Sequence, residues 1–444
     1  MTGSPRRIKI LAGGGSLPRE IAESATARGS EVHIIAIDGE AEADLNPLPV
    51  TRVNWGQIGH LIQALKGTAT DALVIVGSVH RPELWGLKAD LGFFLNLPAI
   101  IRIVASGGDD SVLRRVVRFF EQQGLTVVGP GDVAPELVIG TGALGATEAT
   151  NEDLSDIALG FKVVRALGAY DIGQSVVVSG GTIEAIEGAE GTDRMIERAT
   201  LRRAGKTQDR VQNAEHAEPS VRGVMVKRSK PGQDLRVDMP AIGPETVARA
   251  AAAGLRGIAV EAGSVIVAKR AETIARADRA GIFVAGVPDT AAAEAAPRFK
   301  PSRARGLFRR LGALKPEPHH IGDAEKGVAV IRALLPLAAG RSAVVVRNHV
   351  IAVEAGEGTL AVIGRAATLR QWASLTRRRR GVAVLASPHD LSPAVIRSVE
   401  AAGYAGVAVL EADYALTDFR QALEAADKAG LFVLVGTTRS GVKA

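Results

Sequence analysis

The segment Arg7–Pro18, with the sequence RIKILAGGGSLP, decides the fold class of the first part of the chain. An apolar run that ends at Ala12 is followed by glycines and then by the start of a helix, which is typical of a Rossmann-like sheet. Backbone N–H groups in such a turn can approach a phosphate, and the dipole of the helix favours its negative charge. The residues predicted to bind a nucleotide or phosphate are Gly13, Gly14, Gly15, Ser16, Leu17 and Pro18.

The same turn departs from the dinucleotide fingerprint G-x-G-x-x-G, because Pro18 stands where the third glycine is required. This departure disfavours NAD as the ligand. An alternative also stays open, since many glycine-rich turns serve only to pack a strand tightly against a helix.

Short apolar strands alternate with helices throughout residues 1–135, which favours an α/β domain with an open parallel sheet. After the first strand, Arg7–Ala12, we expect strands at Val32–Ile37, Val50–Asn54, Ala72–Gly77 and Thr126–Val128. The expected helices are Leu17–Arg28, Ile58–Lys66, Phe93–Ala105 and Ser111–Gln123.

Two further loops lie at strand ends, where open α/β sheets bind ligands. They contribute four more candidate substrate-binding residues, which are Gly77, Arg81, Asp109 and Asp110. For the two aspartates, capping of the following helix is the competing explanation.

The composition restricts the chemistry that is available. The 444 residues predict two to four domains, and the absence of cysteine excludes disulfides, thiolate catalysis and cysteine-ligated zinc. The eight histidines are scattered, so oxygen ligands and Mg²⁺ (or Mn²⁺) are the default if a metal is used. The lack of a long apolar run and of a signal peptide, together with the lack of cysteine, predicts a cytoplasmic protein.

The basic character of the chain is local. Seven of the positive charges lie in residues 298–315, within a linker at 291–319 that is rich in alanine, proline and arginine, so nucleic-acid binding is not indicated. Gly306–Lys315 could form a short helix with one apolar and one cationic side, which suits peripheral association with an anionic membrane surface. A solvated connector is the alternative.

Residues 150–290 form a second α/β unit, in which the segment Lys227–Gly243, KRSKPGQDLRVDMPAIG, carries the densest charge pattern. Asp234, Arg236 and Asp238 occupy alternate positions, so in an extended segment they would share one face. That row, with Lys230 beside it, suits a substrate with phosphates and a divalent ion. A solvated edge strand with weak exposed ion pairs is the alternative.

A second group of candidates in this unit precedes two of its secondary-structure elements. Gln174 precedes a strand, and an acidic loop opens a helix near residue 194, where a diphosphate could bind. The candidates in that loop are Glu190, Gly191, Thr192 and Asp193, although Thr192 or Asp193 could instead cap the helix. Residues 204–219 are polar and are expected to form an excursion from the unit.

Residues 320–444 repeat the second unit. Glu187–Thr192 matches Glu354–Thr359 at an offset of 167, and Ala252–Gly257 matches Ala401–Gly406 at an offset of 149, which suggests that the second copy lacks a segment the size of the 204–219 excursion. At these offsets the polar positions change and the apolar ones persist. The pairs compared are Gln174 with Arg341, Asp193 with Leu360, Asp234 with Ala383, Arg236 with Leu385 and Asp238 with Ser387. This pattern favours chemistry in the first copy and a degenerate duplicate that retains only the packing.

Seven stretches in residues 8–290 resemble the LpxI family, the UDP-2,3-diacylglucosamine pyrophosphohydrolases of lipid A biosynthesis. They are AGGGSLP, GSVHRP, GGDDSVLRR, DIGQSVVV, EGTD, KPGQDLRVDMPAIG and VEAG. The resemblance implies a Rossmann-like UDP-binding domain, a catalytic and lipid-binding C-terminal domain, and hydrolysis to UMP and 2,3-diacylglucosamine 1-phosphate (lipid X). It assigns the essential aspartate of the D-x-P-x-x-G motif to Asp238. The chain departs from the family at Ser78 and His80 and in its extra C-terminal copy.

The resulting hypothesis is that a bound Mg²⁺ assists hydrolysis while Asp238 holds either the metal or the attacking water. Asp193 or Asp234 would be the second carboxylate, and Lys230 and Arg236 would neutralise charge on the phosphate oxygens. Two alternatives remain: another nucleotide-sugar enzyme, such as a glycosyltransferase, or a non-catalytic UDP-lipid-binding protein. A homo-oligomer and peripheral binding at the inner membrane through residues 298–315 are also left open.

Overall fold

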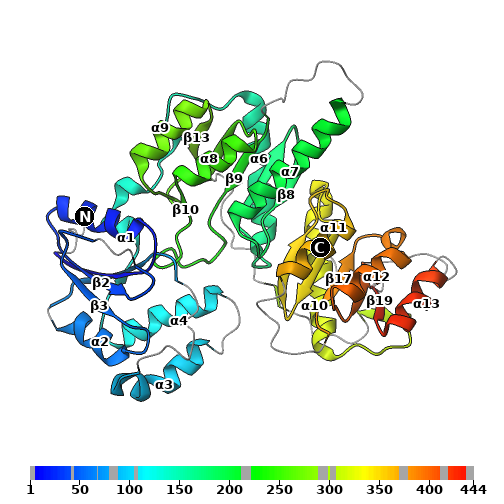
Figure 1. The fold of residues 1–444 in the computed structure, drawn as a ribbon, viewed down its shortest axis with the longest axis horizontal. Coiled ribbons are helices and arrows are strands. Elements are labelled where there is room, and N and C mark those ends of the chain that lie inside the picture. The colour runs from blue at the N-terminus through cyan, green and yellow to red at the C-terminus, as the bar shows by residue number, and fades with distance from the viewer. Residues whose placement is uncertain are drawn as a thin grey trace, which may run out of the picture.

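Three β-sheets of five or six strands follow one another along the chain, each in its own lobe of the computed structural model (Figure 1). The described residues are 6–41, 45–67, 69–79, 89–104, 109–211, 222–288, 299–300, 307–369, 379–410 and 419–436. Within these ranges, no helix has both the length and the apolar character needed to cross a membrane.

The first sheet is entirely parallel, with the strand order β3-β2-β1-β4-β5. Its strands are β1 (Arg7–Ala12), β2 (Glu31–Ile37), β3 (Val50–Val53), β4 (Ala72–Val76) and β5 (Val127–Val128). The helices are α1 (Leu17–Ala27), α2 (Ile58–Lys66), α3 (Leu91–Val104) and α4 (Asp109–Gln122). Apolar clusters cover both faces of the sheet. The Rossmann-like α/β prediction is confirmed, because each expected element is present to within two residues at either end.

The second sheet is mixed, with the order β6-β13-β11-β9-β7-β8. Its strands are β6 (Gly142–Ala143), β7 (Ser175–Ser179), β8 (Thr182–Ile186), β9 (Val224–Lys227), β11 (Gly257–Glu261) and β13 (Phe283–Val287). The helices are α6 (Asn151–Gly168), α7 (Thr192–Val211), α8 (Pro244–Ala252) and α9 (Arg270–Ala280), and a small parallel pair joins β10 (Ala241–Ile242) to β12 (Ile266–Val267). A short helix, α5 (Pro130–Val133), and a 3-10 turn, η2 (Pro135–Leu137), connect the first two sheets.

Two features of this unit were not predicted from the sequence. Strand β9 lies in the centre of the sheet, between β11 and β7. Helix α7 continues to Val211, so part of the expected polar excursion is helical, and residues 212–221 lie outside the described part of the chain.

The third sheet has the same arrangement of strands as the second sheet, with the order β14-β19-β18-β17-β15-β16. Its strands are β14 (Phe308–Arg310), β15 (Ser342–Val346), β16 (His349–Val353), β17 (Val382–Leu385), β18 (Gly406–Val409) and β19 (Phe432–Gly436). The helices are α10 (Pro318–Leu334), α11 (Thr359–Leu369), α12 (Pro393–Ala401) and α13 (Arg420–Ala429), with 3-10 turns η3 (Leu335–Leu337) and η5 (Pro388–Asp390). The duplication is therefore present at the level of topology.

The prediction of a short helix over Gly306–Lys315 is wrong. Phe308–Arg310 instead forms an edge strand antiparallel to β19, in the same position that β6 occupies beside β13. The reason is that Phe308 and Leu311 both pack against apolar clusters that include residues of the third unit. Pairing with the edge of the third sheet, and not helical periodicity, therefore decides their conformation. The amphipathic helix on which the membrane-surface prediction depended is thus absent here.

The strand register also corrects the alignment of the two copies. Ser175 pairs with Lys227 in the first copy, and its counterpart Ser342 pairs with Leu385 in the second, so Lys227 corresponds to Leu385. The pairings of Asp234 with Ala383 and of Arg236 with Leu385 are therefore wrong.

The chain between β9 and α8 has sixteen residues, whereas the chain between β17 and α12 has seven. Half of the missing segment therefore comes from this loop and not from the 204–219 excursion. Most of the loop that carries Asp234, Arg236 and Asp238 is deleted in the second copy, so Asp234 and Arg236 have no counterpart there. Ser387 lies six residues before α12 as Asp238 lies six residues before α8, so the pairing of these two residues is retained.

Candidate active site

The loop between β9 and α8, Arg228–Gly243, folds as a series of turns and not as an extended segment. The backbone N–H groups of Val237 and Asp238 both donate to the carbonyl oxygen of Asp234, at 3.1 and 3.0 Å. A turn at Asp234 removes the period of two, so the expected common face of Asp234, Arg236 and Asp238 does not form.

Arg236 connects this loop to the first domain. Its guanidinium lies 2.7 Å from a carboxylate oxygen of Asp234 and 2.9 Å from one of Glu121 in α4. The hydrogen bond from Arg236 lowers the pKa of Asp234. Because Asp234 pairs with its neighbour at 2.7 Å, it is a positioning group in this structure. Asp193 lies farther from its own partner, 3.6 Å from Arg249, and is the better candidate for the second carboxylate.

Asp238 is half-buried, and its Oδ2 accepts a 2.6 Å hydrogen bond from the side-chain amide of Gln233 within the same loop. Lys230, which was expected to neutralise the substrate, pairs instead with Asp171 at 3.0 Å. The cation nearest to the centre of the site comes from the adjacent strand.

Lys227, the last residue of β9, is only 6% exposed. Its Nζ donates to Thr192 Oγ1 at 3.2 Å and to the carbonyl oxygen of Ala241 at 3.1 Å, and it forms no ion pair within 4 Å among the described residues. Burial lowers the pKa of Lys227, and the charges of Glu187, Asp193 and Asp238 oppose that effect. Of the predicted carboxylates, those of Asp193 and Asp238 therefore act electrostatically on the same buried lysine.

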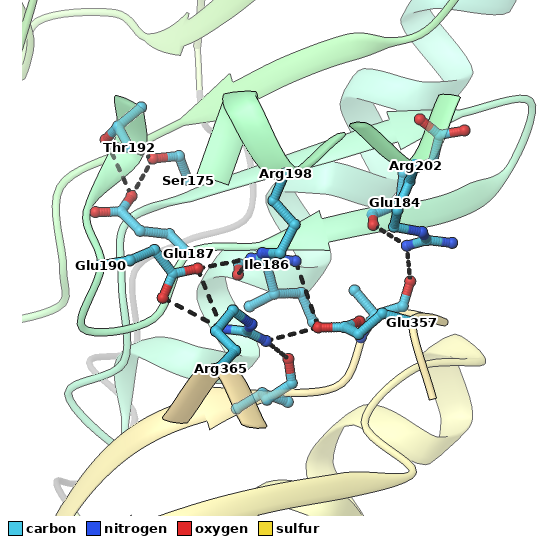
Figure 2. Close-up of polar contacts among 12 residues, drawn as sticks. Ser175, Glu184, Ile186, Glu187, Glu190, Thr192, Arg198, Arg202, Glu357 and Arg365 are labelled. Atoms are coloured by element: carbon cyan, nitrogen blue, oxygen red, sulfur yellow. Dashed lines mark hydrogen bonds and ion pairs between the residues drawn. The ribbon is translucent and has the colours of Figure 1, made fainter. Parts of the chain in front are cut away.

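Beside Lys227, the carboxylate of Glu187 accepts hydrogen bonds from the hydroxyls of Ser175 and Thr192 (Figure 2). It also accepts from the backbone N–H of Gln174, whose own Oε1 is buried without a hydrogen-bond partner in the described structure. The hydroxyl of Thr192 thus links Glu187 to Lys227.

The carboxylate of Glu190 is occupied by two ion pairs, which corrects its assignment as a binding residue. Its side chain is 3% exposed and lies 2.7 Å from Arg198 and 3.2 Å from Arg365 of the third unit (Figure 2). Gly191, which follows it, has a φ of +83°, and its counterpart Gly358 has a φ of +86°. The left-handed turn explains this glycine in both copies without a ligand.

On the other side of β9, Arg228 lies 3.0 Å from Glu261, which also accepts hydrogen bonds from Ser229 and Ser264. Burial disfavours the charged form of Glu261, but the hydrogen bonds from Ser264 and Ser229 and the charge of Arg228 outweigh it, so the pKa is lowered.

A cavity of about 960 Å³ lies beside this pair. It is bounded by the connecting segment 129–141, by Leu235, Arg236 and Met239, and by residues 261–263. The β9–α8 loop is therefore one wall of an open site. In the sequence, Asp238 lies between the lining residues Arg236 and Met239.

Family comparisons agree with this architecture. Residues 7–137 match the family model of the LpxI N-terminal domain, and residues 140–285 and 309–434 each match that of the LpxI C-terminal domain. The chain belongs to the LpxI family. It is 38% identical over 285 residues to the UDP-2,3-diacylglucosamine pyrophosphatase LpxI of Caulobacter vibrioides, an alignment that covers 64% of this chain and 98% of that relative.

The two LpxI C-terminal domains of one chain serve as a control for each other. Glu187, Ser175 and Thr192 correspond to Glu354, Ser342 and Thr359, and the latter hydroxyls also donate to the glutamate, at 2.6 and 3.3 Å. A cluster that both copies keep supports the fold, so Thr192 and Glu187 act as a scaffold for Lys227.

The buried charges beside that scaffold occur in the first LpxI copy only. Lys227 becomes Leu385 and Glu261 becomes Leu410. Arg228 corresponds to Ala386. This pairing follows because the N–H of Arg228 donates to the carbonyl oxygen of Gln174, and the N–H of Ala386 donates to the carbonyl oxygen of Arg341, the counterpart of Gln174. Burying charged groups costs free energy, and the second copy folds without these charges. Lys227, Arg228 and Glu261 are therefore not required for the fold. Lys227 and Arg228 belong to the charged segment that the sequence singles out, but neither they nor Glu261 were predicted as site residues.

The N-terminal glycines of this LpxI chain are explained largely by packing. The N–H of Gly14 donates to the carbonyl oxygen of Ser78 at 2.7 Å, and Ser78 donates back to Gly14 at 3.0 Å. A Cβ on Gly13 would lie 2.4 Å from the Ser78 oxygen, and one on Gly77 would lie 2.7 Å from the carbonyl carbon of Gly13. Gly15, in contrast, has open space around it, although its φ of +89° also favours glycine without a ligand. A phosphate contact at Gly15, Ser16 and the start of α1 at Leu17–Pro18 stays a prediction.

Three other predicted residues cannot be placed in this way. Arg81 lies outside the described residues. Asp109 and Asp110 begin α4, which agrees with a position at the helix N-terminus, but their side chains are outside the described part of the structure.

Gly13→Ala is expected to lower the free energy of unfolding by about 1–3 kcal/mol, because the new methyl group would collide with the backbone at Ser78. Urea denaturation measures the effect. Gly364→Ala in α11 is the control, since a Cβ there meets no atom within 4 Å and alanine favours the helix. Equal stability of the Gly13 variant and the parent would contradict the packing role.

Proposed function

We propose that this chain hydrolyses the diphosphate of UDP-2,3-diacylglucosamine to UMP and 2,3-diacylglucosamine 1-phosphate, a step of lipid A biosynthesis. The observation that carries the proposal is the buried Lys227 with Asp193 and Asp238 around it, in the first LpxI C-terminal copy and not in the second. The activity printed for the relative from Caulobacter vibrioides supports the same reaction.

In this mechanism the substrate diphosphate lies against Lys227, where its negative charge compensates a cation that has no ion pair among the described residues. Asp238, held by Gln233, orients the attacking water and accepts its proton. The water oxygen forms a bond to the sugar-side phosphorus, the bond from that phosphorus to the bridging oxygen breaks, and UMP leaves. The ammonium of Lys227 stabilises the charge that develops on the phosphorus oxygens.

The open cavity beside the β9–α8 loop suits the remainder of a large substrate. Arg236 and Glu261 line it, and both belong to ion pairs that fix the cavity walls. The nucleotide would extend toward the Gly15–Ser16 turn of the first domain.

A divalent cation fits the carboxylates of this site. No group of three or more potential ligands occurs among the described residues, and Mg²⁺ typically uses one or two carboxylates together with substrate phosphates. Asp238 and Asp193 would hold Mg²⁺ or Mn²⁺, and the ion would supply further neutralisation of the diphosphate when bound.

The proposal is tested by incubating the purified chain with UDP-2,3-diacylglucosamine in water and following both products by ³¹P NMR. Equimolar UMP and sugar 1-phosphate are expected without any acceptor. Turnover only with a sugar acceptor would instead identify a glycosyltransferase, and binding without turnover would identify a UDP-lipid-binding protein. In H₂¹⁸O, the label is expected in the sugar 1-phosphate.

Removal of divalent cations with EDTA is expected to lower turnover by about 100-fold or more, because the diphosphate then keeps its full charge at the site. Added Mg²⁺ or Mn²⁺ should restore it. Electron paramagnetic resonance of Mn²⁺ gives a second readout, since Asp238→Asn should weaken binding of the ion to the free protein. Full turnover in EDTA would exclude the metal.

A further inference from the structure

The two LpxI C-terminal copies contact each other through the same face. Four side chains meet at the junction: Glu190 and Arg198 from the first copy, and Glu357 and Arg365 from the second (Figure 2). The second pair lies 167 positions after the first, which is the offset of the duplication at this point. The junction is therefore built from equivalent residues.

Each contact in this group of four has a counterpart. Within the copies, Arg198 lies 2.7 Å from Glu190 and Arg365 lies 2.6 Å from Glu357. Between the copies, Arg198 lies 3.4 Å from Glu357 and Arg365 lies 3.2 Å from Glu190. The arginine of each copy thus contacts the glutamate of the other copy. This reciprocity of equivalent residues is the defining property of an isologous twofold interface.

The backbone follows the same symmetry. Arg198 donates to the carbonyl oxygen of Ile186 at 2.7 Å, and Arg365 donates to that of Val353 at 3.1 Å, again 167 positions later. Helices α6 and α10, which are also equivalent, pack against each other, and one apolar cluster includes residues of both copies. The interface therefore has a continuous core as well as a polar centre.

The polar centre is buried. The side chains of Glu190 and Glu357 are 3% and 6% exposed, and those of both arginines are 15% exposed. Buried charges are tolerated when each has a partner, and here the two positive and two negative charges cancel. Either copy alone would leave one pair uncovered, so the face is complementary to a second copy of itself.

We propose that this face, defined by Glu190, Arg198 and α6 in the first copy, is a self-recognition surface whose partner is a second copy of the same domain. In this chain the partner is supplied by residues 309–434, so one copy carries the chemistry and the other fills its interface. The chain is then a monomer of 46.2 kDa in solution, with an internal pseudo-dimer. This inference does not depend on the proposed reaction.

The test uses charge exchange in the full chain. Glu357→Arg with Arg365→Glu keeps an opposite-charged pair within the second copy but places like charges across both contacts to the first. The copies should separate, and the native face of the first copy should then pair with the same face of another molecule. The exchanged face of the second copy is complementary to itself as well, so sedimentation equilibrium is expected to show a mass of at least twice that of the parent chain.

The matched control adds Glu190→Arg and Arg198→Glu to that variant. Every contact then has opposite charges again, with reversed polarity, and the chain should return to a monomer. A monomeric two-residue variant, a dimeric parent, or equal masses for the two-residue and four-residue variants would each overturn the proposal.

A second measurement covers the case in which the exchanged chains do not fold. Glu190→Gln, Arg365→Gln and their combination remove one contact between the copies with little change in size. The decrease in the thermal midpoint of the double variant should be smaller than the sum of the decreases in the two single variants. Additive losses would show that the two residues do not interact in solution and would overturn the proposal.

Discussion

Asp238→Asn should lower the rate of UMP release by about 10²–10⁴-fold, the range expected when a positioned proton acceptor is removed. The amide cannot take a proton from water, yet it keeps the size of the side chain. Its hydrogen-bond partner Gln233 belongs to the same loop, so the fold should persist. Steady-state hydrolysis of UDP-2,3-diacylglucosamine gives kcat, and circular dichroism checks that the thermal midpoint is retained.

The control for this variant is Asp390→Asn. Asp390 lies in η5, within the short loop that replaces the β9–α8 loop in the second copy, and it pairs with Arg341 at 3.3 Å. We expect its turnover to equal that of the parent. An active Asp238→Asn protein would remove Asp238 from the chemistry, and a loss in both variants would point to a structural effect.

Lys227→Leu should lower kcat by about 10²–10³-fold, comparable to removal of one preorganised group that stabilises transition-state charge. The same change should leave stability unaltered or raise it, because burial lowers the pKa of Lys227 and its ammonium has no ion pair among the described residues. Leucine is the residue that the second copy places at this position, as Leu385. Activity and stability are therefore expected to change in opposite directions.

The converse variant, Leu385→Lys, introduces an ammonium into a core where Glu354 is the counterpart of Glu187 but where Leu360 stands in place of Asp193. Leu385 is fully buried in an apolar cluster of the third unit. The expected loss is up to about 3–5 kcal/mol, the range for a poorly compensated buried charge, and chemical denaturation measures it. If Lys227→Leu instead unfolded the protein while Leu385→Lys did not, Lys227 would be a structural residue.

The sequence alone predicted the parallel sheet of the first domain, the duplicated unit and the importance of the segment that contains Asp238. The strand Arg7–Ala12 and the helix Ile58–Lys66 have the bounds that were expected. These features depend on local patterns, such as alternation of apolar runs and glycine turns, or on the similarity of two segments of the same chain. Either kind of signal is legible without knowing which segments meet.

The predictions from the sequence were wrong where a residue's role depended on a distant partner. Glu190 looked like part of a diphosphate loop, but it contacts Arg365, 175 positions away. The row of Asp234, Arg236 and Asp238 looked extended, but Arg236 turns toward Glu121, 115 positions earlier. The correct pairing of the two copies required the strand register, because the second copy lacks residues in two separate places.

Only the tertiary structure identified Lys227 as the centre of the site and the Glu–Arg group of four as an interface. Lys227 reaches Thr192 across 35 positions because β9 lies inside the sheet beside β7. The physical reason is that periodicity reports which face of an element is apolar, whereas strand order decides which charged groups are buried together. Burial then gives those groups their chemistry.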